Sequence, residues 1–333
     1  MNNLPLLKLE NLKSYYPIRE GVFSRITGHV KAVDNVSFEI FPHETLGLVG
    51  ESGCGKTTIG KAIMRLEEIS GGRVMFDGED ISGYSRSRMR TVWKRMQMIY
   101  QDPYSSLNPR KTVESMLEEA LAAHRIVSRK AIPGEIDRLL NLIGLSPEFK
   151  KRYPHEFSGG QRQRISIARA LAMRPEFIIC DEAVSALDVS IQAQILGLFR
   201  ELRGKLGLTY LFIAHGLGAV KYLSDRIAVM YLGKIVELAP TELLFSDPRH
   251  PYTQALLSAY PIPDPAKRNQ ERAVLSGQAP SPANPPSGCA FHTRCPFRQA
   301  LCSETEPELR EEDRRQTACH FRINYSQWKK TAL

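Results

Sequence analysis

Long apolar runs are missing from this sequence. No stretch approaches the ~18 consecutive apolar residues that suggest a membrane-spanning helix. Residues 1–5 also lack the basic region and apolar core that begin a secretory signal. We therefore expect a protein that is neither secreted nor membrane-spanning. The composition, 42% hydrophobic and 24% charged, is that of a globular protein, and the length of 333 residues suggests two domains.

Basic residues are not concentrated in any one segment either. The formal net charge is +9, but Lys and Arg are spread along the chain. Such a charge attracts either nucleic acid or an anionic membrane surface, and by itself it does not choose between them.

A phosphate-binding pattern, G-x-x-x-x-G-K-[ST], runs from Gly50 to Thr57. Residues 45–49 before it read as a short apolar strand, and residues 59–66 after it have helical apolar spacing, so the required strand, loop and helix are present. Glycines let backbone N–H groups converge on phosphate oxygens at a helix N-terminus. We expect Lys56 to contact the β/γ-phosphates and the Thr57 hydroxyl to bind Mg²⁺. The alternative is a glycine-rich turn that only begins a helix.

A second potential anion site lies at residues 158–161. Ser158 is a good N-cap, and Gly159 and Gly160 leave backbone N–H groups free to approach a phosphate. An apolar, alanine-rich helix is expected over residues 165–173.

Polar residues follow three apolar segments that read as core strands. Asp181 and Glu182 end one of them, where Asp181 suits a Mg²⁺ contact and Glu182 suits a base that activates water. A solvent-facing strand end can also carry two acids. Gln101 follows another segment, where it can touch Mg²⁺ or water. His215 follows a third, and although a lone His is more often structural, this position favours the same crevice.

In this order, these motifs resemble the nucleotide-binding subunit of an ABC transporter over about residues 6–245. The resemblance implies that Glu182 is the catalytic base, assisted by the switch His215 and the Q-loop Gln101. It implies Mg²⁺ contacts from Thr57, Gln101 and the Walker B Asp181. The implied nucleotide-binding residues are Tyr16 (adenine stacking), Gly50, Ser52, Gly53, Cys54, Gly55, Lys56, Thr57 and Thr58 (phosphate loop), Ser158, Gly159, Gly160 and Gln161 (signature motif) and Asp188 (D-loop).

Three positions qualify this assignment. On the residues alone, Tyr16 is equally well read as a half-buried strand tyrosine or as a ring that stacks on adenine. Ala183 stands where the family commonly has proline, and Gly216 where it commonly has aspartate. Neither departure removes a phosphate-contacting group, so they bear on rate and on the geometry around His215 rather than on the reaction.

The remainder of the chain narrows the resemblance. Residues 247–257 and 280–289 resemble the C-terminal extension of oligopeptide/dipeptide importers, and residues 106–110 and 152–157 resemble their second, F-type ATPase. The implied fold is α/β: a P-loop, RecA-like ABC ATPase core over residues 1–245 with an N-terminal antiparallel β subdomain and a helical subdomain inserted at about 102–165. A small Cys-rich extension follows over residues 246–333.

The function implied by this resemblance is ATP hydrolysis that powers peptide import. The implied partners are a second, related ATPase in a heterodimer, two membrane permease subunits and an extracytoplasmic solute-binding protein, with no nucleic acid. The implied location is peripheral, on the cytoplasmic face of the inner membrane. Nickel, sugars or another small solute remain alternatives to peptides. A DNA-maintenance ATPase is disfavoured because no sustained heptads separate Lys56 from Ser158.

Four of the six cysteines, Cys289, Cys295, Cys302 and Cys319, lie in the final 45 residues. The preceding segment is rich in Pro, Ser and Gly and offers little apolar material for a core. Disulfides do not suit a reducing cytosol, which leaves a metal or cluster as the staple. Zinc sites usually show paired C-x2-4-C ligands, absent here, whereas iron–sulfur clusters tolerate wider spacings. Some members of the importer family hold a [4Fe-4S] cluster, which we therefore expect; zinc and unligated thiols are the alternatives.

Overall fold

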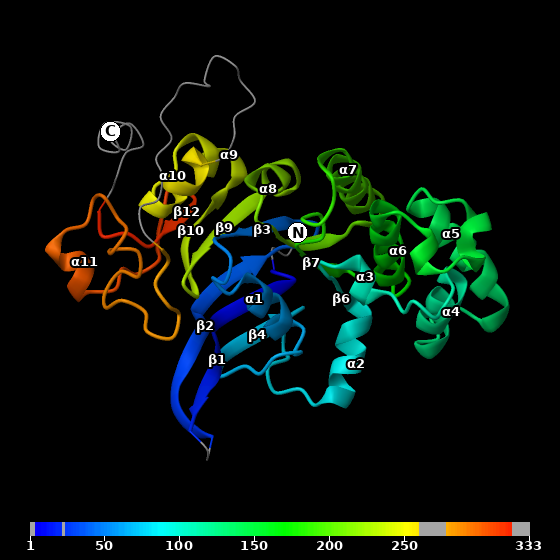
Figure 1. Cartoon of the computed structure of the whole chain (residues 1–333), viewed down its shortest axis with the longest axis horizontal. Helices are drawn as coiled ribbons and strands as arrows, with labels where there is room; N and C mark the ends of the chain where they lie inside the picture. Colours follow the sequence, from blue (N-terminus) through cyan, green and yellow to red (C-terminus); the bar gives the residue numbers. More distant parts are fainter. Residues whose placement is uncertain (1–3, 22–23, 260–277, 322–333) are drawn as a thin grey trace. The chain divides into compact units, whose positions relative to one another are not determined.

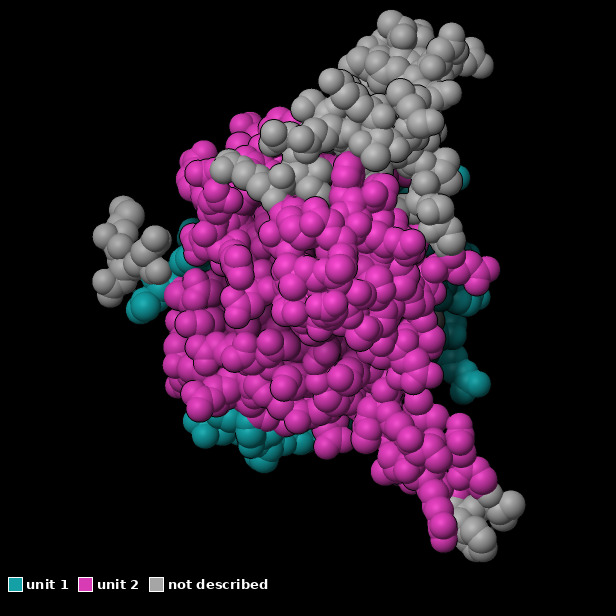
Figure 2. Space-filling model, turned by 90° about the vertical axis from the view of Figure 1, so that its left-hand side faces the viewer, with its two compact units in different colours: residues 1–4, 40–45, 83–214 teal, residues 5–39, 46–82, 215–333 magenta. Residues whose placement is uncertain are grey.

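The computed structural model describes residues 4–21, 24–259 and 278–321 (Figure 1). The chain divides into two compact units (Figure 2). Unit 1 contains residues 1–4, 40–45 and 83–214, and unit 2 contains residues 5–39, 46–82 and 215–333. Within the described ranges, no helix combines the length and the apolar character needed to cross a bilayer.

An antiparallel sheet in unit 2 contains four strands in the order β2, β1, β4, β5. Buried Leu7 and Leu9 alternate with half-buried Lys8 and Glu10 along β1, the period of two that a sheet with one covered face requires. The expected N-terminal antiparallel sheet is therefore present. The strands are β1 (Leu7–Glu20), β2 (Arg25–Ile40), β4 (Gly71–Phe76) and β5 (Glu79–Asp80).

A second set of strands in unit 2 includes the one that precedes the phosphate loop. Strand β3 pairs in parallel with β9, and β9, β10, β12 and β11 continue as antiparallel neighbours in that order. Leu238 of β10 is opposite Gln316 of β12, so the C-terminal extension joins unit 2 by main-chain pairing. The strands are β3 (Thr45–Val49), β9 (Arg226–Tyr231), β10 (Lys234–Pro240), β11 (Arg310–Glu312) and β12 (Arg315–Thr317).

Short helices accompany these strands. In unit 2 they are α1 (Lys56–Ile63), α8 (Leu217–Leu223), α9 (Thr241–Ser246), α10 (Pro251–Ser258) and α11 (Ala300–Glu304). The α1 helix follows β3 directly through the phosphate loop, which is the strand, loop and helix order that the sequence predicts.

Unit 1 contains three parallel strands in the order β6, β7, β8. Every residue of β7 and β8 is buried, which explains their uninterrupted apolar sequences. The region between β6 and β7 is helical, as expected for the insertion. The elements are β6 (Met96–Ile99), β7 (Phe177–Asp181), β8 (Thr209–Ile213), α2 (Arg86–Arg95), α3 (Pro103–Ser106), α4 (Val113–Ala123), α5 (Ile132–Leu142), α6 (Gly159–Leu171), α7 (Val189–Leu206) and the 3₁₀ turns at Arg129–Ala131, Pro147–Lys151 and Pro154–Glu156.

The α6 helix begins six residues earlier than the periodicity predicts, at Gly159 instead of residue 165. Ser158 is its N-cap, and the Ser158 and Gln161 side chains each accept a hydrogen bond from the other's backbone N–H. This capping box fixes the first turn, where backbone N–H groups need no helical partner and glycine is tolerated. The predicted glycine-rich segment is thus the first turn of the helix itself.

Candidate nucleotide-binding site

The phosphate loop is held against its surroundings at glycine positions. A Cβ on Gly50 would clash with the carbonyl oxygen of Met230, and one on Gly55 would clash with that of Ala32. Gly55 also has φ 108, a conformation that other residues rarely adopt, and it caps α1. The loop's Cys54 carbonyl accepts the Gly233 N–H at 2.9 Å. The backbone of the loop is therefore fixed without any ligand.

Lys56 lies inside this loop. Its side chain is buried, with 4% of its surface exposed. The Nζ atom donates to the carbonyl oxygens of Gly50 at 2.9 Å and Glu51 at 3.0 Å. The Cys54 thiol is buried beside it, with Sγ 3.8 Å from Nζ, so Cys54 can offer a ligand only its backbone. The ammonium is thus already centred on the loop that would receive phosphate.

Glu51 has partners that the sequence did not reveal. Its backbone N–H donates to the Tyr252 hydroxyl at 2.8 Å. Its carboxylate forms a bidentate pair with Arg294, with Nη1–Oε2 at 2.9 Å and Nη2–Oε1 at 3.0 Å. This pair raises the pKa of Arg294 above its usual value. The one available signal was an acid within an anion-binding loop, which calls for a cationic partner.

The two predicted acids of unit 1 are buried at the end of β7. Asp181 is its last residue and Glu182 follows, with 4% and 6% of their surfaces exposed. Glu182 has φ 51, which is uncommon for a residue with a side chain and which turns the chain sharply at this point. Its N–H donates to Ile213 at 2.9 Å, and its carbonyl accepts from Ser185 at 3.0 Å. The backbone therefore holds this conformation from both sides.

Gln101 and Glu182 follow neighbouring parallel strands. Ile99 of β6 is opposite Cys180 of β7, so both residues lie at the carboxyl edge of these strands, as the sequence predicts. Gln101 is exposed. His215, two residues beyond β8, is exposed and begins the last segment of unit 2.

The signature segment presents exposed backbone. Ser158 and Gly159 at the start of the 13-residue α6 are exposed, whereas Gly160 is buried against α7, where a Cβ would lie 2.5 Å from a methyl of Ile191. Asp188 is the exposed N-cap residue of α7, and its side chain makes no capping hydrogen bond.

The two adjacent tyrosines of β1 differ in environment. Tyr15 donates its hydroxyl to Asp34 at 2.5 Å, and burial raises its pKa. Tyr16 has 36% of its surface exposed. The ring predicted to stack on adenine is therefore the accessible one of the two.

The four C-terminal cysteines line one small cavity of about 10 Å³ in unit 2. The Cys289 N–H donates to the Cys302 carbonyl at 2.8 Å, which joins two segments of the extension. Burial raises the pKa of Cys295 to about 12 and that of Cys319 to about 11. The remaining lining residues are His250, Pro251, Phe291, His292, Phe297, His320 and Phe321.

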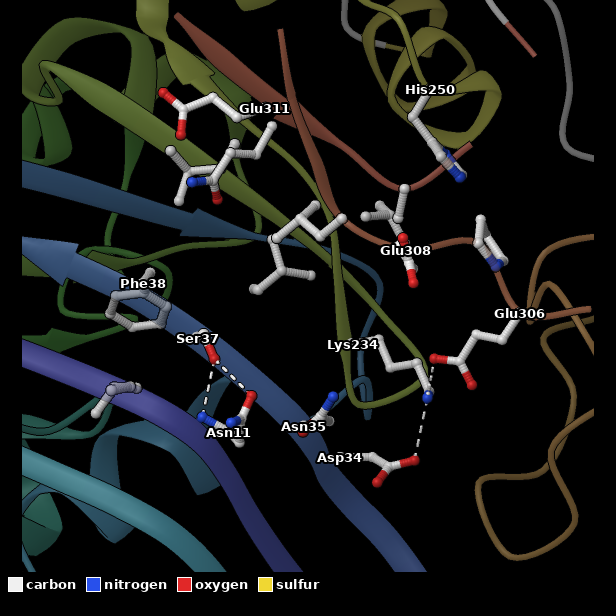
Figure 3. A pocket seen from close by; sticks show the side chains of 18 of the residues that line it. Asn11, Asp34, Asn35, Ser37, Phe38, Lys234, His250, Glu306, Glu308 and Glu311 are labelled. Carbon is white, nitrogen blue, oxygen red and sulfur yellow. Dashed lines mark hydrogen bonds and ion pairs between the residues drawn. The ribbon is translucent and has the colours of Figure 1, made fainter. Parts of the chain in front are cut away.

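A larger cavity of about 1010 Å³ also lies in unit 2 (Figure 3). Lys234 at its wall joins β2 to the extension, because its Nζ lies 3.2 Å from Asp34 and 2.5 Å from Glu306. Acidic side chains outnumber basic ones in the lining, but the ion pairs of Lys234 are structural ties.

Comparison with known proteins identifies the chain. The sequence model of the ABC transporter family matches residues 33–185, and that of the oligopeptide/dipeptide transporter C-terminal region matches residues 236–302. The oligopeptide transport ATP-binding protein AppF of Bacillus subtilis is 52% identical over 314 residues, which cover 93% of this chain and 95% of that protein. The chain belongs to the ATP-binding subunits of oligopeptide/dipeptide ABC transporters.

Further relatives agree with this membership. The putative oligopeptide transport ATP-binding protein YkfD of B. subtilis is 50% identical over 97% of this chain and 98% of its own length. A solved structure of the ATP-binding cassette MJ0796, bound to ADP and Pi, matches with a TM-score of 0.62 at 25% identity, covering 71% of this chain and 98% of that one. CbiO1 of Clostridium perfringens, part of an ABC transporter complex, matches with the same TM-score over 73% of this chain and 91% of its own.

Three predictions are thereby confirmed for this ABC transporter subunit. Its fold is the α/β P-loop fold of an ABC ATPase. It is an ATPase whose hydrolysis is coupled to transport, and its class is that of peptide importers. The alternative of a DNA-maintenance ATPase falls away, since the match continues through the importer-specific C-terminal region. The roles of individual residues stay predictions.

The cysteine cavity allows a test of the expected cluster. Four thiolates around one zinc ion lie about 2.3 Å from it and so about 4 Å from one another. Within the described ranges, no three His, Cys, Asp or Glu side chains are placed to hold an ion. A cubane cluster separates its thiolates more widely, and four cysteines around one cavity are its donor set. The residues therefore fit a cluster in kind and number and do not form a single-ion site.

His250, beside this cavity, predicts a pH-dependent stability. Burial lowers its pKa to about 3, while its Nδ1 accepts the Tyr252 N–H at 3.1 Å. The unfolded state, with a pKa near 6.5, binds the proton first, so the contribution of His250 is lost as the pH falls below about 6.5, by up to ~1.4 kcal/mol per pH unit. Glu237, whose pKa burial raises, acts in the opposite sense.

The variant His250→Asn isolates this contribution, because asparagine keeps a helix cap without titrating. We expect the midpoint of thermal unfolding to fall between pH 6.5 and pH 4.5 more steeply for the wild type than for this variant. Equal slopes would show that His250 is protonated in the folded protein.

Proposed function

We propose that this subunit binds ATP at an interface with a second, related ATPase and powers the import of peptides through two membrane permease subunits. The observation that carries this proposal is the presence, in one chain, of an ABC transporter core and an oligopeptide/dipeptide transporter C-terminal region. The subunit would act from the cytoplasmic face of the inner membrane, as a peripheral protein, and an extracytoplasmic binding protein would select the solute.

ATP binding begins at the phosphate loop. The Lys56 ammonium would exchange its two loop carbonyls for oxygens of the β- and γ-phosphates, and the other loop residues would contribute N–H groups. Thr57, Gln101 and Asp181 would hold Mg²⁺, which supplies charge neutralisation when bound. Ser52, Gly53 and Thr58 complete the contacts proposed for the loop.

Hydrolysis would be directed by the buried acid after β7. The turn at Glu182, fixed by its left-handed conformation, sets the direction of a carboxylate that orients and deprotonates the attacking water. His215 would sense the γ-phosphate. Because phosphoryl transfer depends on positioning, a backbone held on both sides suits this role.

The signature segment would serve the partner's nucleotide. Ser158 and Gly159 are exposed at the N-terminus of a long helix, where free N–H groups and the helix dipole favour an anion. Gln161 holds this turn through the capping box, and the exposed Asp188 lies at the start of α7. A second chain would offer its own signature segment in return, and the resemblance to F-type subunits indicates a heterodimer.

The transported solute is tested on the binding protein encoded beside this subunit. We expect calorimetry to show binding of di- or oligopeptides and no binding of nickel or free sugars. Binding of nickel or a sugar with peptides excluded would assign the same machinery to that solute.

Tyr16→Ala should weaken ATP binding by about 1–3 kcal/mol, because an exposed aromatic ring can stack on adenine. Tyr16→Phe, which keeps the ring, is the matched control and should bind ATP as the wild type does. Equilibrium titration with ATP and with inorganic tripolyphosphate separates stacking from folding. A loss of equal size for tripolyphosphate, which has no base, would count against stacking.

The C-terminal cysteines would hold a [4Fe-4S] cluster with a structural role. What supports this is the gathering of four thiols around one cavity in an extension whose strands β11 and β12 are three residues each. Binding would remove the thiol protons, so assembly should weaken at low pH. The cluster remains a proposal, and zinc is its alternative.

Anaerobically purified protein should contain roughly four irons per chain and absorb visible light. Cys302→Ser should lose iron and lower the unfolding temperature of the extension while leaving ATP binding largely intact. Cys180→Ser, in the buried strand β7, is the control and should keep its iron. Stoichiometric zinc without visible absorbance would contradict the cluster.

A further inference from the structure

Glu51 places a negative charge inside a loop that has to receive a triphosphate. It is the second residue of the phosphate-binding pattern, and its carbonyl oxygen accepts from the Lys56 ammonium. Like charges at short range inside a protein repel more strongly than in water. An unpaired carboxylate here would therefore oppose the binding that Lys56 favours.

Arg294 removes this difficulty. Its two terminal nitrogens each bond one oxygen of the Glu51 carboxylate, the planar fork geometry in which guanidinium and carboxylate match best. The Arg294 side chain is 6% exposed and that of Glu51 25% exposed, so the pair is largely shielded from solvent. Screening by water and salt is correspondingly weak.

The pair rests on a rigid base. Tyr252 accepts the Glu51 N–H, and its ring centroid lies 4.7 Å from that of Tyr231 and 5.4 Å from that of Phe291. Tyr252 and Phe291 are buried. Arg294 donates its own N–H to the Phe291 carbonyl at 3.0 Å, so the same aromatic residue supports both partners of the ion pair.

Arg294 reaches the loop from a distant part of the chain. It is 243 residues away from Glu51 and lies between Cys289 and Cys295 in the extension. The contact therefore joins the C-terminal extension directly to the nucleotide site.

We propose that Arg294 is a positioning residue of the nucleotide site: it neutralises Glu51 and fixes the start of the phosphate loop, so that the C-terminal extension sets the affinity for ATP. This inference rests on the proposed assignment of the phosphate loop to ATP. Arg294 does not touch the nucleotide and acts through Glu51.

The test is a double-mutant cycle measured as the equilibrium affinity of the full-length protein for MgATP and MgADP. Arg294→Met leaves the Glu51 charge unpaired and should weaken MgATP binding by about 10-fold or more. The loss should be smaller for MgADP, which carries less negative charge. Adding Glu51→Gln to Arg294→Met should restore MgATP affinity to within ~3-fold of the wild type, because the charge to be neutralised is gone.

Two results would overturn the proposal. One is wild-type MgATP affinity in Arg294→Met, and the other is a double variant that binds as weakly as this single variant. Arg294→Lys keeps the charge and provides an arm that does not depend on the Met variant folding. It should bind MgATP at least ~3-fold more tightly than Arg294→Ala, and equal weakness of the two would also overturn the proposal.

The controls separate this inference from the assignment of the site. The wild type has to bind MgATP, and Lys56→Ala has to lose that binding. Failure of either control would count against the phosphate loop as the ATP site, whereas normal controls with an unaffected Arg294→Met would count against Arg294 alone.

Discussion

Lys56→Ala should lower the affinity for MgATP by about 100-fold or more. The Lys56 ammonium is the charge that the loop itself directs at the β- and γ-phosphates, and a hydrogen bond between charged groups contributes ~1.5–3 kcal/mol. Losing one such contact to each phosphate corresponds to a change of this size. Because the Nζ atom is already held by two loop carbonyls, its removal also loosens the empty loop.

The affinity is measured by isothermal calorimetry with MgATP. Lys61→Ala is the matched control, since Lys61 is on the same helix but is 38% exposed and pairs with Glu67 at 3.8 Å. It should bind MgATP as the wild type does. Unchanged affinity in Lys56→Ala would remove the phosphate loop from the account.

Glu182→Gln should bind ATP normally and hydrolyse it about 10²–10⁴ times more slowly. The amide preserves the shape of the buried side chain and cannot accept a proton from water. Its left-handed backbone and the hydrogen bonds that fix it are unchanged, so the loss falls on chemistry rather than on folding. With its partner ATPase, the variant should accumulate as a closed, ATP-bound dimer.

Phosphate release by the heterodimer and gel filtration with ATP measure these two effects. Glu176→Gln is the control, because Glu176 precedes the opposite end of β7 and pairs with Arg95 at 2.7 Å. It should hydrolyse ATP at the wild-type rate. Normal turnover in Glu182→Gln would mean that another residue is the base.

Local patterns predicted much of the fold and of the site. The strand before the phosphate loop, the buried run that becomes β7 and the acids that end it follow from periodicity and from short motifs. These features depend on neighbours within a few residues of one another. The start of α6 was missed because periodicity weighs apolar spacing, whereas the capping box at Ser158 decided where the helix begins.

Contacts between distant segments were not predictable in this way. The pair of Glu51 and Arg294 depends on how the extension packs, and the pairing of β12 with β10 depends on only two or three residues. Neither leaves a periodic signal. The left-handed conformation of Glu182 is likewise imposed by the hydrogen bonds around it and not by the residue type.

ATP-dependent peptide uptake by the reconstituted transporter tests the central claim most directly. Proteoliposomes would contain both permease subunits and both ATPases, with the binding protein and a labelled peptide supplied on the extracytoplasmic side and MgATP on the other. We predict accumulation of peptide with the wild-type subunit and none with Glu182→Gln or without ATP. Equal uptake in the presence of Glu182→Gln, or hydrolysis that continues with no peptide movement in the wild type, would contradict the account.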